Sequence, residues 1–111
     1  MESSQDPGRA ARLAVTRATF RNANNQVAQK AVELDVRERP LPFVCECDDA
    51  ACRLFVRLTL VEYEDVRADA TQFVVVPGHE APSDRVLQVN ARYVIVAAEG
   101  EAGDLAAGLD V

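Results

Sequence analysis

Three cysteines and one histidine are the residues of this sequence whose types and spacing could do chemistry. Cys45, Cys47 and Cys52 are its only cysteines, and they lie within eight residues in the pattern Cys-x-Cys-x4-Cys. His79, the only histidine, follows 27 residues later in the segment Pro77–Glu80. Three thiolates and one imidazole form a complete ligand set for a tetrahedral structural zinc site. The sequence therefore predicts that these four residues bind Zn²⁺.

Other interpretations of the cluster stay open at this point. The thiols could serve redox chemistry without a metal, or they could simply be buried as small apolar groups, although their acidic neighbours argue against apolar surroundings. His79 could be an ordinary surface or core residue, in which case Glu46, Asp48 or Glu80 would supply an oxygen ligand. Water or an external thiol could also complete the coordination, and an open position would favour catalysis.

Length and composition favour one small domain that gains stability from a metal. The chain has 111 residues, 49% of them apolar, and no tryptophan, so its core is modest. No run of 18 apolar residues is present, which predicts no membrane span. The polar segment Met1–Asp6 lacks the apolar stretch of a secretory signal, so we expect a cytoplasmic protein. Thiols stay reduced there, and clustered cysteines then favour metal over disulfides.

The charge is acidic and unevenly distributed. The net charge is −6; residues 1–42 carry seven Lys or Arg against five Asp or Glu, and residues 43–111 carry five against thirteen. An acidic surface repels a phosphate backbone, so nucleic acid is not an expected partner. No serine–histidine–aspartate set, phosphate-binding loop or paired-acid pattern is recognisable, and this favours a non-enzymatic protein.

A long helix is expected near the N-terminus. Residues 1–9 are predicted to be a disordered lead-in, and residues 10–38 a helix that ends before Pro40. The helix carries a stripe that recurs every seven residues, as in helices that pair with other helices. We expect the later part of this stripe to pack on the rest of the chain. The earlier part, with an arginine-rich flank, would bind a protein partner or a second copy. The stripe is Leu13, Phe20, Val27 and Leu34, with Asn24 on the same face, and the flank is Arg9, Arg12, Arg17 and Arg21.

Residues 39–98 are expected to form a compact zinc-binding module, which makes the fold class α+β. The expected order is β-β-α-β-β-β, with the cysteines on the first hairpin. Thr59 and Glu62 have the spacing of a capping box at the start of the short helix. Residues 99–111, which are rich in glycine, alanine and acidic residues, are predicted to be a disordered tail. The expected strands are 43–47, 54–58, 73–76, 86–89 and 93–96, and the expected helix is 60–68.

The segment Arg39–Val96 resembles a group of small, largely uncharacterised bacterial zinc-module proteins. Their motifs occur in order as Pro-Phe-x-Cys-Glu-Cys-x4-Cys, Leu-Thr-Leu-x-Glu-Tyr-Glu-x-Val-Arg and Phe-Val-Val-x-Pro-Gly-His-Glu. In this chain they span Pro42–Cys52, Leu58–Arg67 and Phe73–Glu80, and Phe20–Asn24 is similar to the Phe-Arg-x-x-Asn helix that precedes the module. The resemblance implies a stand-alone metal-binding module with an N-terminal helix, and it implies no established activity.

Together these patterns predict a non-enzymatic regulatory or adaptor protein with a structural zinc site and a helix for partner binding or self-association. The alternative is a thiol-based redox switch that releases zinc when its cysteines are oxidised. A small metal-dependent hydrolase with an open zinc position is a third hypothesis.

Overall fold

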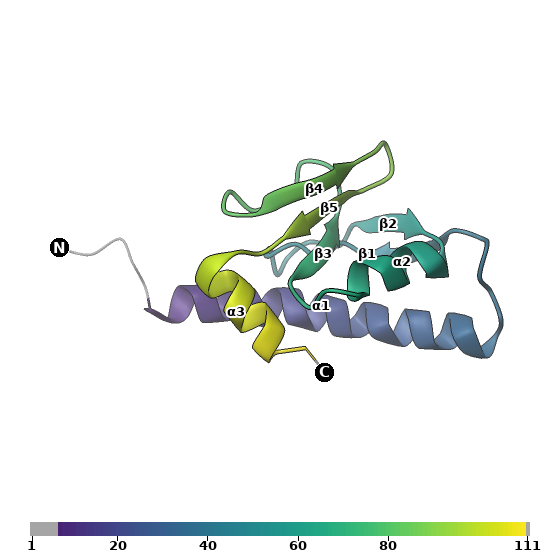
Figure 1. Ribbon diagram of the computed structural model, residues 1–111, viewed down its shortest axis with the longest axis horizontal. Coiled ribbons are helices and arrows are strands. Elements are labelled where there is room, and N and C mark those ends of the chain that lie inside the picture. The colour runs from purple at the N-terminus through teal and green to yellow at the C-terminus, as the bar shows by residue number, and fades with distance from the viewer. Residues whose placement is uncertain (1–6, 111) are drawn as a thin grey trace.

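A single long helix, α1 (Pro7–Glu33), runs along one side of the molecule, and the strands lie beside it (Figure 1). The computed structural model describes residues 7–110. The α+β class is confirmed, with two small sheets and three helices in the described part of the chain. The other elements are β1 (Leu41–Val44), β2 (Phe55–Leu58), α2 (Leu60–Arg67), β3 (Gln72–Val75), β4 (Arg85–Val89), β5 (Val94–Ala97) and α3 (Gly100–Gly108).

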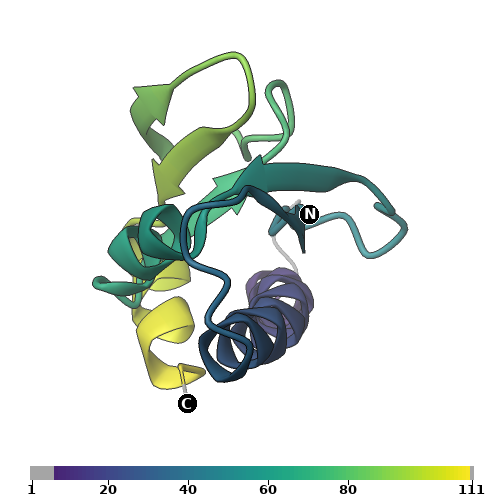
Figure 2. The same ribbon diagram turned by 90° about the vertical axis from the view of Figure 1, so that its right-hand side faces the viewer.

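Both sheets are antiparallel. β1 pairs with β2, and the three-stranded sheet has the order β3-β5-β4. Side chains alternate between the two faces of a strand, and Val74 and Val75 of β3 are both fully buried, so this strand is covered on both faces. One face packs against the cysteine segment and α3, and the other against α2 and the β1–β2 pair. Seen along α1, the sheets lie above this helix and the two shorter helices lie to its left (Figure 2).

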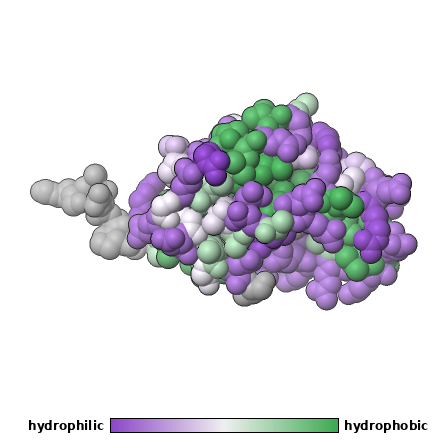
Figure 3. Space-filling view, in the orientation of Figure 1, coloured by the Kyte–Doolittle hydropathy of each residue, from purple (hydrophilic) through white to green (hydrophobic). Residues whose placement is uncertain are grey.

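β4 is the exposed edge of the three-stranded sheet. All five of its residues are exposed, and Val86 and Val89 pair with the buried Val96 and Val94 of β5. The apolar face of the sheet therefore continues past the layer that covers it. An apolar surface is visible over the region of β4 and β5 (Figure 3).

The face of α1 that contacts the rest of the molecule differs from the predicted stripe. Of the stripe residues, Leu13, Phe20 and Val27 are half-buried, and Leu34 lies beyond the helix end with 63% of its surface exposed. The buried positions instead lie three, four or seven residues apart. Three of the five are polar, because their side chains hydrogen-bond to the rest of the molecule. The buried positions are Ala14, Arg17, Arg21, Asn24 and Ala31.

The bounds of α1 also differ from the predicted 10–38. The helix already includes residues 7–9, which were expected to be disordered, and the rest of that lead-in lies outside the described residues. It ends at Glu33 because Asp35 adopts a left-handed conformation, φ 54°, and the Val36 amide donates to the Ala31 carbonyl at 2.9 Å. This is the hydrogen bond of a Schellman stop, with aspartate in the usual glycine position. Pro40 therefore does not set the helix end.

The predicted disordered tail is wrong over most of its length, because Gly100–Gly108 forms α3. Small residues allow the close approach: a Cβ on Gly103 would lie 2.6 Å from the Ala98 carbonyl oxygen. Arg21 of α1 donates to the Ala106 carbonyl of α3 at 2.9 Å. Within residues 7–110, no helix is both long enough and apolar enough to cross a bilayer.

Candidate metal centre

The structure brings together the four residues whose types suggested metal binding. The sulfur atoms of Cys45, Cys47 and Cys52 and a ring nitrogen of His79 all lie within 4.8 Å of one another. His79 Nδ1 is 3.7 Å from both Cys45 Sγ and Cys52 Sγ. A tetrahedral ion with sulfur and nitrogen ligands at about 2.3 and 2.1 Å would hold neighbouring ligand atoms about 3.6–3.8 Å apart. The cluster is thus compatible with a bound metal ion.

Three separate segments supply these ligands. Cys45 and Cys47 follow β1, Cys52 lies in the loop before β2, and His79 follows β3. The predicted strand through Cys47 is too long, since β1 ends at Val44. The two cysteines still point to one side of the chain, with Glu46 between them pointing to the other, as an extended backbone requires.

Backbone hydrogen bonds fix the ligand segments. The Cys45 amide donates to the Leu54 carbonyl at 3.0 Å, which continues the pairing of β1 with β2. The Val76 amide donates to Cys45 Sγ at 3.2 Å. In the next turn, Gly78 has φ 94°, a conformation that favours glycine, and the His79 amide donates to the Val76 carbonyl at 2.9 Å. The Pro-Gly turn thus directs His79 back to the cysteines.

Burial governs the protonation of the inner two thiols. Cys45 and Cys47 expose 1% and 2% of their surface, whereas Cys52 and His79 are half-buried. Burial raises the pKa of both inner thiols, and for Cys45 the hydrogen bond from Val76 only partly opposes this. Metal binding requires thiolates, so a cation in the cluster would displace thiol protons and supply the charge that stabilises the thiolates.

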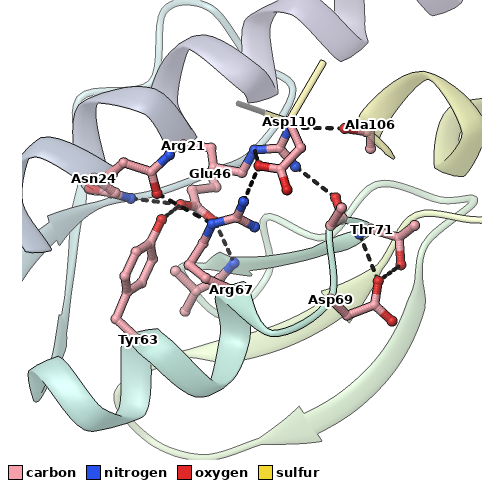
Figure 4. Close-up of polar contacts among 12 residues, drawn as sticks. Arg21, Asn24, Glu46, Tyr63, Arg67, Asp69, Thr71, Ala106 and Asp110 are labelled. Carbon is pink, nitrogen blue, oxygen red and sulfur yellow. Dashed lines mark hydrogen bonds and ion pairs between the residues drawn. The ribbon is translucent and has the colours of Figure 1, made fainter. Parts of the chain in front are cut away.

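Glu46 does not act as the oxygen ligand considered above. Its carboxylate is fully buried beneath α1 (Figure 4). Oε2 accepts hydrogen bonds from Tyr63 Oη at 2.6 Å and from Asn24 Nδ2 at 2.9 Å, and Oε1 accepts from the Val74 amide at 3.0 Å. Burial raises the pKa of this carboxyl, and these hydrogen bonds oppose the rise.

The two other acidic candidates also lie outside the cluster of ligand atoms in the described part of the chain. Asp48 lines a cavity of about 140 Å³ beside Arg17 and Asp84. Glu80 Oε1 accepts a hydrogen bond from the Gly78 amide at 2.8 Å and so stabilises the turn before His79.

The arginines expected to meet an external partner are partly used inside the molecule. Arg17 pairs with both carboxylate oxygens of Asp84, at 2.8 and 3.0 Å. Arg21 donates to two backbone carbonyls, and Asp110 lies next to both Arg21 and Arg67 (Figure 4). The sequence did not predict that Arg17 and Arg21 would be buried and bonded inside the molecule. The only hint was the Phe-Arg-x-x-Asn motif, whose arginine and asparagine are the residues buried here.

Comparison of the chain with family models, with curated proteins and with solved structures finds no match. The feature of the chain that indicates a function is therefore the geometry of the Cys₃His cluster.

Proposed function

We propose that this chain is a small non-enzymatic protein whose Cys₃His cluster binds Zn²⁺ in a structural role. The observation that carries the proposal is the convergence of four donor atoms within 4.8 Å from three separate segments. Three thiolates with one imidazole are a common donor set for structural zinc, and soft sulfur ligands select against magnesium and calcium.

A structural role is favoured over a catalytic one by the number of protein ligands. Catalytic zinc usually keeps one position for water or substrate, whereas structural zinc is enclosed by four side chains. Here His79 lies 3.7 Å from two of the sulfurs, so it is placed to take the fourth position. X-ray absorption of the zinc-loaded protein tests this. We expect three sulfurs at about 2.3 Å and one nitrogen at about 2.0–2.1 Å. A bound oxygen in place of the nitrogen would instead support the hydrolase hypothesis.

A regulatory or adaptor role would require a surface for a partner, and α1 offers one. Val15 and Val32 on this helix are 52% and 44% exposed. At its C-terminal end, Val27 and Leu34 line a groove of about 480 Å³ against Leu41. This groove lies at the C-terminal end of the stripe, whereas the sequence predicted a free surface at its N-terminal end, around Leu13 and Phe20. Light scattering of the intact chain and of Leu34→Glu tests self-association: a dimer that the substitution disrupts supports it, and a monomer in both excludes it.

The partial exposure of Cys52 favours one second candidate, a redox switch. Two zinc thiolates could reduce one molecule of hydrogen peroxide, taking up two protons to form a disulfide and two waters, and zinc would leave. Stoichiometric peroxide should then release zinc, and reductant with added zinc should restore the fold. Retention of all zinc under a large excess of peroxide would exclude the switch and leave the structural role.

A further inference from the structure

Glu46 stands between two of the candidate ligands and is bonded to the interior through its backbone. Its amide donates to the Val74 carbonyl of β3 at 2.8 Å. Its carbonyl accepts from Arg17 Nε of α1 at 2.9 Å. The peptide groups on either side of this residue belong to Cys45 and Cys47, so these bonds hold the ligand backbone against both β3 and α1.

The side chain of Glu46 adds a second set of bonds to the same elements. Its carboxylate accepts one hydrogen bond each from Asn24 of α1, Tyr63 of α2 and Val74 of β3. α1 is far from α2 and β3 in the sequence, and the side chains of Asn24 and Tyr63 meet at this carboxylate (Figure 4). The residue between the metal ligands is thus the point at which the elements join.

Asn24 binds the ligand segment at a second place. Its Oδ1 accepts from the Val44 amide at 2.8 Å, and its Nδ2 donates to the Val44 carbonyl at 2.8 Å. The two bonds fix the orientation of the amide, so that Nδ2 also faces Glu46. The side chain is fully buried, and removal of any one bond would leave a buried polar group without its partner.

We propose that Glu46 and Asn24 are positioning residues for the metal ligands, through which metal occupancy and the docking of α1 are coupled. This inference rests on the proposed zinc site. Coupling of this kind is reciprocal: metal binding favours the docked helix by the same factor by which docking strengthens metal binding. Loosening the helix at Asn24 should therefore lower the metal affinity. Substitutions that touch no ligand should therefore change the metal site.

Two substitutions test the proposal. Glu46→Gln keeps the size of the side chain but replaces one accepting oxygen by a donating amide. In either orientation of that amide, a donor would face another donor, either the Val74 amide or Asn24 Nδ2. Asn24→Leu keeps a similar volume and removes all the bonds of Asn24 at once. The matched control is Arg21→Met on the same helix, since Arg21 is also buried but hydrogen-bonds to the carbonyls of Ala70 and Ala106.

The measurements are zinc affinity by competition with a chelator and the visible absorption of the cobalt(II)-loaded protein, which reports coordination geometry. We expect Glu46→Gln and Asn24→Leu to lower zinc affinity about 10- to 100-fold and to change the cobalt spectrum. Arg21→Met should destabilise the fold and leave the cobalt spectrum of the loaded protein unchanged. If a test variant does not fold, hydrogen exchange of the wild-type chain decides: removal of zinc should speed exchange of the α1 amides around Asn24.

Each outcome separates this inference from the proposed function. A wild-type chain that binds neither zinc nor cobalt overturns both. The inference alone is overturned if the wild-type chain binds metal and the two test variants behave like the control. They would then keep the wild-type cobalt spectrum, and their zinc affinity would fall no more than that of Arg21→Met for the same loss of stability. Unchanged exchange of the α1 amides after zinc removal also overturns the inference.

Discussion

At the residue scale, the four candidate ligands are not held equally. Cys45 and Cys47 are almost fully buried and follow directly on β1, whereas Cys52 and His79 are half-buried in surface loops. Loss of an inner cysteine would leave an incomplete ligand set inside the core, where water cannot easily replace the missing sulfur. Loss of His79 would open the cluster towards solvent, where water can replace the imidazole.

We therefore predict a ranking of ligand substitutions. Cys45→Ser and Cys47→Ser should leave the module unfolded, because structural zinc contributes about 10–16 kcal/mol in small domains, against a typical domain stability of about 5–15 kcal/mol. His79→Ala should retain zinc with weaker affinity. Zinc content and circular dichroism of each variant check this, with the exposed Ser83→Ala, four residues after His79, as the control. Equal losses for His79→Ala and Cys45→Ser would contradict the ranking.

The candidate metal ligands could be identified from the sequence, and the burial of Glu46 could not. Three cysteines within eight residues, with a single histidine, suggest a site by residue type alone. A glutamate followed closely by Asp48 and Asp49 suggests solvent exposure. Its burial depends on hydrogen-bond donors from Asn24, Tyr63 and Val74, whose convergence appears only in three dimensions.

At the element scale, the predicted capping box of α2 is confirmed. The Thr59 hydroxyl accepts from the Glu62 amide at 3.2 Å, and the Glu62 carboxylate accepts from the Thr59 amide at 2.8 Å. Arg92 also donates to Glu62, at 2.9 Å. The hydrogen bond from Arg92 is the main reason why the pKa of Glu62 falls to about 2.

This shift predicts the pH dependence of one substitution. A carboxyl whose pKa is lower in the folded state stabilises the fold above its unfolded pKa of about 4.3, and this contribution is lost as the pH falls towards 2. Glu62→Gln should therefore cost about 0.5–1 kcal/mol at neutral pH, and the difference from wild type should shrink below pH 4. Denaturant unfolding at several pH values measures it, with the exposed Glu64→Gln as control. A pH-independent difference would contradict the assignment.

Helix α3 shows that amino-acid composition alone can wrongly predict disorder where close packing stabilises a helix. Glycine, alanine and acidic residues suggested a disordered tail, but small side chains also allow a helix to lie close to other backbone. Gly103 is buried at such a contact with Ala98, whereas a Cβ at Gly108 would have nothing within 4 Å.

The two glycines of α3 make a matched pair for a test. Gly103→Ala should destabilise the protein by about 1–3 kcal/mol, the usual cost of overpacking, because its Cβ would meet the Ala98 carbonyl oxygen at 2.6 Å. Gly108→Ala should be neutral or stabilise by up to about 1 kcal/mol, because alanine favours a helix more than glycine does. Thermal melts of both variants check this. Equal melting temperatures would show that α3 is not docked as described.

The seven-residue stripe of α1 was misleading for a related reason. Periodicity identified the helix and its length to within a few residues, but the apolar residues do not mark the buried face. That face is mostly polar because Arg17, Arg21 and Asn24 reach backbone carbonyls of other elements. A hydrophobic pattern identifies a buried face by its apolar residues, so it does not reveal a face that is buried through hydrogen bonds.

At the scale of the whole molecule, the cysteine segment lies between the two parts of the core. Cys45 and Cys47 pack with Phe73, Val75 and the residues of β5, and the preceding β1 packs with α2. A metal at this place would join segments from three regions of the chain, in a protein whose small core has few other means of cross-linking them. We therefore expect the fold as a whole to require zinc.

The most direct test of this central claim is thermal unfolding of the purified protein before and after chelation, with zinc measured in the same samples. We predict about one zinc per chain, the number of ions that a single tetrahedral site of four ligands holds. Chelation should abolish the cooperative transition, and added zinc should restore it. Protein that contains no zinc, or that melts identically after its zinc has been removed, would contradict the account.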